Sequence, residues 1–504
     1  MSRTFRLAAA AVAVATLGAS ATAGVATAQH NAQRGSDQRE IRNVIYLLGD
    51  GMGRTHVTAA RERYYGADGK LVMETMPHVG QNRTYSIEPN SGQPGEPDFV
   101  PNYVTDSASA ATAWTTGQKT YNAALAVDGK GKSHATVMEL AKKAGYRTGN
   151  VSTAEITDAT PAGQMSHVLM RGCQGPEYSA KACQNTEVTG TELPTTDLRV
   201  TPVADQIARN NTADVIMGGG LSRFDAADEK ALKDNGYTVL GSPAAQRVAT
   251  EADMNRVKTS RRGPQKKVFA LYNKGNLTIE KSKRENPTAP GAKEPTVAEM
   301  TRKSIELLDS KKGKKGFYLQ VEGALIDKRS HANDAAQTLE ETKAFDEAVR
   351  VALDFAKRDK HTLVIVTADH ECAGFNIIEK GTYTNAEAAT PPANVDSGNP
   401  ANNSVPSRAK GSALDPKRSS GIINGAGKDD AANFGPATFR TPDDAAGVAD
   451  GTPEASLWLS YLSGNHTGAD VPVYGYGPGS SKVSGSIENT DLFGIVGQAL
   501  GVVR

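Results

Sequence analysis

The sequence predicts an α/β fold with a central, mostly parallel β-sheet and helices on both faces. Two observations predict it. Short apolar runs of strand length alternate along the chain with stretches that have the periodicity of amphipathic helices. Several of the apolar runs also end directly in Asp, Glu or His, and open α/β sheets carry their binding sites at the carboxyl ends of their strands. The same pattern therefore predicts both the fold and the place of a functional site.

The elements are expected in the following order. Strands are predicted at residues 43–48, 214–217, 237–240, 268–272, 316–321 and 362–367, and helices at residues 297–308 and 338–356. The first strand stops at Gly49, Asp50 and Gly51, where glycine lets the chain turn and approach a ligand closely. Asp50 is therefore expected at the carboxyl end of a buried strand.

Residues 104–114 are expected to run from the end of a strand into a helix rich in small residues, with Ser107 at the start of that helix. A helix N-terminus carries unpaired N–H groups and a partial positive charge, so it attracts anions such as phosphate. Ser107 is thus a candidate nucleophile beside an anion site. Taken alone, Asp106 and Ser107 are explained equally well as helix caps, since Asp and Ser lead the capping preferences.

Three predicted strand exits deliver acidic and histidine side chains, a set made of Asp50, Glu322, Asp327, His331, Asp369 and His370. Asp327 and His331 are four residues apart and would share one face of a helix. So much like charge in one place is tolerated only when cations neutralise it. The set therefore indicates a metal site.

From about residue 43 to residue 500 the chain resembles the bacterial branch of the alkaline phosphatases. The motifs that carry the resemblance are 49–53 (GDGMG), 105–108 (TDSA), 151–155 (VSTAE), 158–162 (DATPA), 321–323 (VEG), 326–328 (IDK), 367–370 (TADH) and 466–468 (HTG). The resemblance implies an alkaline-phosphatase-like sandwich and a secreted, metal-dependent phosphomonoesterase that releases inorganic phosphate and an alcohol from phosphate monoesters.

The resemblance also implies three metal ions. It assigns one Zn2+ to Asp327, His331 and His466, a second Zn2+ to Asp50, Asp369 and His370, and one Mg2+ to Asp50, Thr160 and Glu322, with Asp158 as a carboxylate in the outer shell of the magnesium. The ligand types agree, because zinc is commonly held by imidazole and carboxylate whereas magnesium takes oxygen ligands. The identity of the third ion in vivo stays open.

The resemblance implies roles for the residues around phosphate. Ser107 would attack phosphorus and form a phosphoseryl intermediate, with Asp106 beside it. Arg171, thirteen residues past Asp158, would grip two phosphate oxygens, and Lys328 would meet phosphate through water. Two other functions compete with this interpretation: a phosphodiesterase or sulfate-ester hydrolase with the same two-metal core, and a secreted phosphate or metal binder without catalysis.

The start of the chain indicates export. Arg3 and Arg6 precede an apolar run at residues 7–19, and small residues at 26–28 offer a cleavage point, so residues 1–28 are expected to be a Sec-type signal peptide. Residues 29–42 would be a flexible segment leading into one domain at 43–504. No other stretch is apolar enough to span a membrane, and the net charge of +1 argues against a nucleic-acid partner.

Three further features concern the cysteines, a long loop and assembly. In an oxidising compartment Cys173 and Cys183 are expected to form a disulfide. Cys372, where the family often has histidine, would be either an outer-shell neighbour of zinc or a buried structural thiol. Residues 381–453 are poor in large apolar side chains and are expected to be an insertion, either a disordered excursion or a cap over the site. Many relatives pair as homodimers, and the sequence leaves the oligomeric state open.

Overall fold

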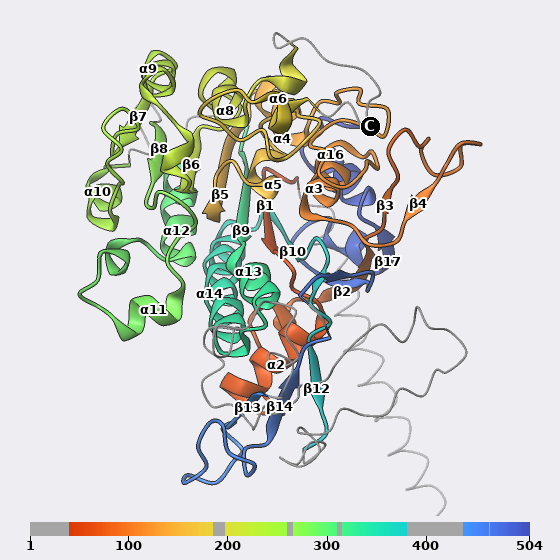
Figure 1. Cartoon of the computed structure of the whole chain (residues 1–504), viewed down its shortest axis with the longest axis vertical. Coiled ribbons are helices and arrows are strands. Elements are labelled where there is room, and N and C mark those ends of the chain that lie inside the picture. Colours follow the sequence, from red (N-terminus) through yellow and green to blue (C-terminus); the bar gives the residue numbers. More distant parts are fainter. Residues whose placement is uncertain (1–39, 185–196, 260–265, 310–314, 381–436, 463) are drawn as a thin grey trace, which may run out of the picture.

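The computed structural model describes residues 40–184, 197–259, 266–309, 315–380, 437–462 and 464–504 (Figure 1). The predicted signal peptide, most of the predicted flexible segment and residues 381–436 of the predicted insertion lie outside the described residues. Within the described ranges, no helix is both long enough and apolar enough to cross a membrane.

A ten-stranded sheet forms the centre of the molecule, in the order β17-β2-β16-β10-β1-β9-β5-β6-β8-β7. Its strands are β1 (Asn43–Gly49), β2 (His78–Arg83), β5 (Arg147–Glu155), β6 (Val215–Gly219), β7 (Tyr237–Leu240), β8 (Lys267–Leu271), β9 (Phe317–Gly323), β10 (Thr362–Thr367), β16 (Val471–Tyr476) and β17 (Gly485–Glu488). All neighbours from β10 to β7 are parallel, and β16 pairs antiparallel with both β10 and β2. The predicted mostly parallel α/β sheet is confirmed.

Helices cover both faces of this sheet. Because side chains alternate along each strand, one strand can contribute to the cores on both faces. Ile45 and Leu47 of β1 belong to one hydrophobic core, whereas Val44, Tyr46 and Leu48 belong to another. The first core includes side chains of α2 (Arg54–Tyr65), α10 (Glu251–Arg256), α12 (Val297–Leu308), α13 (Leu325–His331) and α14 (Ala335–Asp359). The second includes side chains of α3 (Ser107–Thr116), α4 (Val137–Lys143), α5 (Ala159–Ala162), α6 (Ala180–Cys183), α8 (Val203–Asn210), α9 (Ala226–Asp234) and α16 (Asp491–Ala499). The short helix α11 (Glu280–Glu285) contacts α14.

Three small sheets lie outside the central one. They are β3 (Ser86–Ile87) with β4 (Pro101–Asn102), β11 (Glu371–Cys372) with β15 (His466–Thr467), and β12 (Asn376–Ile378) with β14 (Leu457–Ser460) and β13 (Ala437–Phe439). Strand β13 falls inside the predicted insertion, and its Phe439 is buried in the first core. The pair β11–β15 carries His466 to the site.

The predicted strands and helices lie close to the observed ones, apart from three differences. Residues 104–106 are not a strand, because the preceding strand β4 belongs to a separate two-stranded hairpin and ends at Asn102. Glu322 lies within β9 and not beyond it, because pairing with β1 and β5 continues through this residue. The long helix α14 begins earlier than predicted, since Asp334 caps it by accepting a hydrogen bond from the N–H of Gln337.

Candidate active site

Three neighbouring parallel strands deliver acidic groups to one edge of the sheet. Leu48 of β1 is level with Thr367 of β10 and with Glu322 of β9. The residues that follow β1 and β10, Asp50 and Asp369, therefore leave the sheet at the same edge as Glu322. Parallel strands in register force these side chains together, as the strand exits in the sequence predicted.

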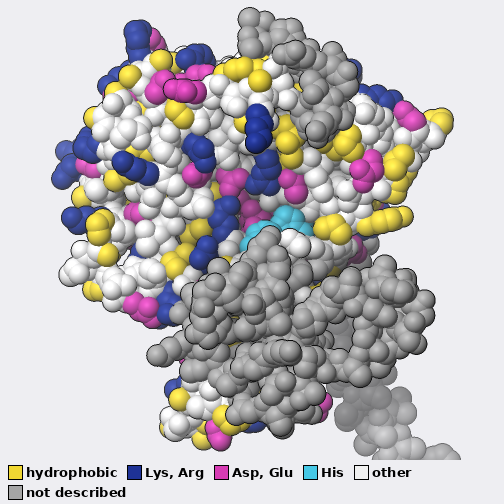
Figure 2. Space-filling view, in the orientation of Figure 1, with side chains coloured by type: hydrophobic (Ala, Val, Ile, Leu, Met, Phe, Trp, Pro, Cys, Tyr) yellow, Lys and Arg dark blue, Asp and Glu magenta, His cyan; other side chains and the backbone are white. Residues whose placement is uncertain are grey.

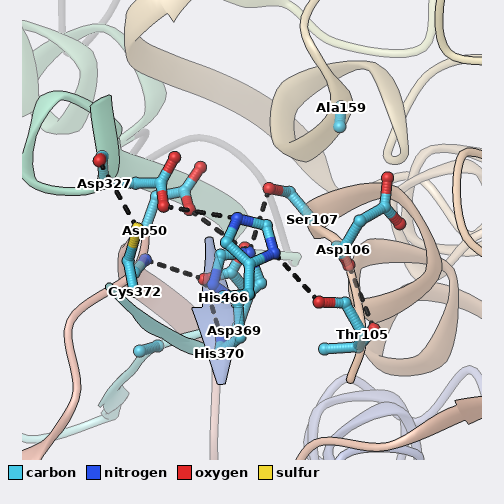
Figure 3. Close-up of polar contacts among 12 residues, drawn as sticks. Asp50, Thr105, Asp106, Ser107, Ala159, Asp327, Asp369, His370, Cys372 and His466 are labelled. Atoms are coloured by element: carbon cyan, nitrogen blue, oxygen red, sulfur yellow. Dashed lines mark hydrogen bonds and ion pairs between the residues drawn. The ribbon is translucent and has the colours of Figure 1, made fainter. Parts of the chain in front are cut away.

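Ser107 is the first residue of helix α3, and Asp106 caps that helix by accepting a hydrogen bond from the N–H of Ser109 at 2.9 Å. The Ser107 side chain is buried, and its hydroxyl lies 3.2 Å from Nε2 of His370 (Figure 3). Asp106 is thus a helix cap, in agreement with the simpler interpretation of the sequence. Ser107 nevertheless points at the histidine and carboxylate groups, so capping by Asp106 and a chemical role for Ser107 are compatible.

Asp327, His331 and His466 converge from helix α13 and strand β15. Nε2 of His331 lies 3.2 Å from Oδ2 of Asp327, and Nε2 of His466 lies 3.6 Å from Oδ1 of the same carboxylate. The backbone fixes both rings, because Nδ1 of His331 bonds to the carbonyl of Gly464 at 2.7 Å and Nδ1 of His466 to that of Thr105 at 3.0 Å. Both Nε2 atoms are left facing the carboxylate, an orientation typical of metal-binding histidines.

Asp50, Asp369 and His370 form a second group beside the first. Nε2 of His370 lies 3.0 Å from Oδ2 of Asp369 and 3.7 Å from Oδ1 of Asp50. The N–H of Gly51 donates to the other oxygen of Asp369 at 3.0 Å. The ring of His370 stacks on that of His466 with their centres 3.5 Å apart, so the two groups are in direct contact.

The donor set fits metal ions on the evidence of its own electrostatics. The buried Oδ1 atoms of Asp50 and Asp327 have no hydrogen-bond partner. Burial, followed by the charges of Asp369 and Asp327, raises the pKa of Asp50 well above its usual range. Burial also opposes ionisation of Asp327, but its interactions with His331 and His466 outweigh that effect and hold its pKa well below the usual range. A buried carboxylate oxygen without a hydrogen-bond partner is costly, and a divalent cation at these two oxygens would remove that cost.

Glu322 and Thr160 form an oxygen-only group of the site. Glu322 is buried and accepts a hydrogen bond from the hydroxyl of Ser152, which is level with it on β5. Burial raises the pKa of Glu322 to about 8, and interactions with Ser152 and Thr160 offset this only in part. These are all oxygen donors, the chemistry that Mg2+ prefers.

Asp158 joins the two basic residues of the site. Its Oδ1 accepts from Nη2 of Arg171 at 2.6 Å, and its Oδ2 accepts from Nζ of Lys328 at 2.7 Å. Arg171 also donates from Nη1 to Asp106 at 3.1 Å. Burial opposes ionisation of Asp158, but Lys328 and Arg171 prevail and hold its pKa below the usual range. The guanidinium is therefore fixed through Asp106, the residue that directly precedes Ser107.

The structure brings together every site residue that the sequence singled out, and it adds contacts that the sequence did not reveal. The disulfide predicted between Cys173 and Cys183 is confirmed, and Cys173 lies two residues beyond Arg171. Ser152 was missed as the partner of Glu322, although it lies in the 151–155 motif. The carbonyls that orient His331 and His466 were also missed, because a backbone acceptor leaves no mark in a sequence. Histidine side chains reach the surface among acidic and basic ones (Figure 2).

At one edge of the sheet lie two carboxylate–imidazole groups, an oxygen-only group, a buried serine at a helix N-terminus and a fixed arginine. This combination defines a metal-dependent hydrolase acting on phosphate esters. Comparison with known proteins agrees. The profile of the alkaline phosphatase family matches residues 41–502, and the chain belongs to that family. It is an alkaline phosphatase, a metal-dependent phosphoric monoester hydrolase.

Individual relatives match about two thirds of the chain or more. The chain is 34% identical to an alkaline phosphatase of Escherichia fergusonii, over 92% of this chain and 87% of that protein. It is 40% identical to alkaline phosphatase H of Pseudomonas aeruginosa, over 66% of this chain and 70% of that protein. The structure of the alkaline phosphatase from the Antarctic bacterium TAB5 superposes with a TM-score of 0.61 at 25% identity, covering 92% of this chain and 100% of that one.

Proposed function

We propose that this alkaline phosphatase is exported and hydrolyses phosphate monoesters through a covalent phosphoserine at Ser107, with two zinc ions and one magnesium ion. The observation that carries the proposal is the position of the Ser107 hydroxyl. It is buried at the N-terminus of α3 and lies 3.2 Å from Nε2 of His370. A serine at the first position of a helix has no need to face a carboxylate–imidazole group unless it has a chemical role.

The three donor groups would hold the three ions. Asp327, His331 and His466 would hold one zinc, Asp50, Asp369 and His370 the other, and Asp50, Thr160 and Glu322 the magnesium. When bound, such ions neutralise the buried carboxylates, lower the pKa of a nearby hydroxyl or water, and stabilise negative charge on the attacking and leaving oxygens. The orphaned Oδ1 atoms of Asp50 and Asp327 support this assignment.

The chain's own residues account for binding and for the covalent step. Arg171 would grip two nonbridging oxygens of the phosphate, while Asp106 and Asp158 hold its guanidinium in place. Ser107 gives up its hydroxyl proton to solvent as its Oγ attacks phosphorus, the bond from phosphorus to the ester oxygen breaks, and the departing oxygen takes up a proton to leave as the alcohol. Water then attacks the phosphoserine, the Oγ–phosphorus bond breaks, and inorganic phosphate departs. Lys328, bonded to Asp158, would contact phosphate through water.

Export and organisation are part of the same proposal. The predicted signal peptide at residues 1–28 and the Cys173–Cys183 disulfide both suit the periplasm or the cell exterior. The mature chain would be one domain at 43–504 carrying an insertion at 381–453, without a nucleic-acid partner, and its oligomeric state stays open.

Metal content and burst kinetics with an aryl phosphate test the proposal. We expect the native protein to hold about two zinc ions and one magnesium ion and to release a burst of aryl alcohol. Ser107→Ala should keep its metals and lose the burst. Ser109→Ala is the matched control, because Ser109 lies in the same turn and bonds to Asp106 without facing His370.

One outcome would overturn the covalent mechanism. If Ser107→Ala retained metal and showed an unchanged burst, Ser107 would have only a structural role at the start of α3. Faster turnover of an aryl phosphodiester or aryl sulfate than of the monoester would then favour the phosphodiesterase or sulfatase alternative. Stoichiometric phosphate binding without turnover would favour the non-catalytic binder.

A further inference from the structure

Cys372 lies directly opposite His466 in the two-stranded sheet β11–β15. The pair is in register, so the two side chains occupy facing positions on antiparallel strands. The chain has three cysteines, and the other two form the Cys173–Cys183 disulfide. Cys372 is therefore the single free thiol of the chain, and it is fully buried beside a histidine of the candidate metal site.

The sulfur is within reach of a complete set of donors. One ligand atom each from Asp327, His331, Cys372 and His466 can be chosen so that all four lie within 4.8 Å of one another. Oδ1 of Asp327 is buried and has no hydrogen-bond partner, so it independently points to a cation as its partner. Figure 3 shows Cys372 beneath Asp327, with Asp50 next to both.

The backbone around Cys372 is fixed close to the site. Its N–H donates to the carbonyl of Gly51 at 3.1 Å. Gly51 has a φ of +69°, and a β-carbon there would come within 2.8 Å of Cβ of Cys372 and of Oδ1 of Asp327. The turn after Asp50 thus needs glycine at position 51, because Cys372 and Asp327 leave no room for a β-carbon there. The thiol makes only a weak contact of its own, to the carbonyl of Asp327 at 3.7 Å.

We propose that the Cys372 thiolate is a fourth protein donor to the metal ion of the Asp327, His331 and His466 group. The inference rests on the proposed function, in that this group must hold a divalent ion. Binding forms a sulfur–metal bond and releases the thiol proton to solvent. A carboxylate, two imidazoles and a thiolate select zinc or cobalt over magnesium, calcium and manganese, which prefer oxygen.

Two consequences follow for this position. The Asp327 group should retain its zinc against a chelator longer than the Asp50, Asp369 and His370 group, which has no sulfur donor. The ion would also have to accept a phosphate oxygen as a fifth ligand, an expansion that catalytic zinc tolerates. The alternative is a buried structural thiol, since Cys372 also packs in the first hydrophobic core.

Cobalt substitution of the full chain separates these alternatives. After metal removal and refilling with Co2+, the native protein should show a thiolate-to-cobalt charge-transfer absorption in the near ultraviolet, in addition to the weaker d–d bands. Cys372→Ser should lose the charge-transfer absorption and keep the d–d bands. Asp369→Asn is the matched control: it alters the other metal group and should keep the charge-transfer absorption.

A zinc competition experiment gives a second readout. The affinity of Cys372→Ser for the more tightly bound of its zinc ions should be lower than that of the native protein by about tenfold or more. If the serine variant does not fold, Cys372→Ala replaces it in both experiments. The charge-transfer absorption of the native protein can be measured without any variant. Stoichiometric cobalt binding without the charge-transfer absorption would overturn the thiolate ligand and leave the proposed function standing. Absence of stoichiometric cobalt or zinc binding would instead refute the proposed metal centre.

Discussion

Arg171 and Asp158 form the shortest contact among the basic and acidic side chains around Ser107, with Nη2 of the arginine 2.6 Å from Oδ1 of the aspartate. Asp106 holds the other end of the guanidinium at 3.1 Å. Burial opposes the charge on Arg171, yet Asp158 and Asp106 raise its pKa well above the usual range. The arginine is thus always charged, and its orientation is fixed before any phosphate arrives.

Replacing Arg171 should weaken phosphate recognition strongly. Arg171→Ala removes charge-assisted hydrogen bonds worth about 1.5–3 kcal/mol, so kcat/KM for an aryl phosphate should fall by roughly 10- to 150-fold. Arg171→Lys should restore little of this loss, because an ammonium cannot form the two-pronged contact. Steady-state kinetics and inhibition by inorganic phosphate measure both effects.

Arg63→Lys is the control for the arginine substitution. Arg63 bonds in the same two-pronged way to Asp450, with both contacts at 2.7 Å, but it belongs to helix α2 and touches none of the site residues. Its kcat/KM should match that of the native protein. Equal losses in the Arg63 and Arg171 variants would mean that the effect is one of stability and not of phosphate binding.

Removing the metal ions should destabilise the protein. Four acidic residues of the site are buried: Asp50, Glu322, Asp327 and Asp369. Once the ions are removed, the nearby histidines and Lys328 are left to balance their negative charge. A ligand present at a thousandfold its dissociation constant stabilises by about 4 kcal/mol for each site. Thermal unfolding after exhaustive chelation should therefore occur at a clearly lower Tm, and added zinc should raise the Tm in a concentration-dependent way.

Asp50→Asn distinguishes site binding from nonspecific binding of zinc. Asp50 contributes to two of the proposed metal groups, so its substitution should reduce the rise in Tm on adding zinc and also reduce the effect of magnesium. An unchanged response in this variant would place the stabilising ions elsewhere on the chain.

The sequence was most informative about the central strands. Each is buried on both faces, so β1 and β10 are continuous apolar runs that end in Gly-Asp or Asp-His, and their ends were predicted to within a residue. Residues placed by these ends, such as Asp50 and Asp369, could be assigned to one edge of the sheet from the sequence pattern alone. The helical spacing of Asp327 and His331 was equally plain, and both lie in α13.

Contacts set by long-range pairing were not predictable from local sequence. His466 reaches Asp327 through the two-residue strand β15, which is too short to have a recognisable pattern. Only the family resemblance placed His466 in the site. The error at residues 104–106 has a similar cause, because the preceding strand β4 ends at Asn102 and pairs with β3 and not with the central sheet.

The His167–Glu139 pair should make stability depend on pH. The two side chains lie 3.0 Å apart. Burial opposes protonation of His167, but Glu139 outweighs it and raises the pKa above the usual 6.5. Burial likewise opposes ionisation of Glu139, but His167 outweighs it and lowers that pKa below the usual 4.5. The histidine's contribution is therefore complete below pH 6.5 and lost as pH rises through its folded pKa, and the glutamate's is complete above pH 4.5 and lost on acidification.

Glu139→Gln should consequently cost about 1 kcal/mol near pH 6 and progressively less toward alkaline pH. Glutamine keeps the capping box with Thr136 while removing the charge. Glu299→Gln is the matched control, since Glu299 forms the same box with Thr296 and bonds to no histidine in the described part of the chain. Urea unfolding of each variant across this pH range measures the difference, and identical pH profiles for the two variants would refute the pairing.

The Cys173–Cys183 disulfide should stabilise the segment that carries Arg171. It closes a loop with a sequence separation of 10, for which loop entropy predicts about 3 kcal/mol. Both cysteines are buried in the second core. The carbonyl of Cys173 also accepts a hydrogen bond from the N–H of Val203 at 2.8 Å, and this hydrogen bond attaches the segment to helix α8. The double variant Cys173→Ala, Cys183→Ala should unfold at lower denaturant and show a larger rise in KM than fall in kcat, because Arg171 loses part of its support. Reducing the native protein should reproduce both changes, and a double variant with unchanged stability and KM would show that the remaining contacts suffice to position the arginine.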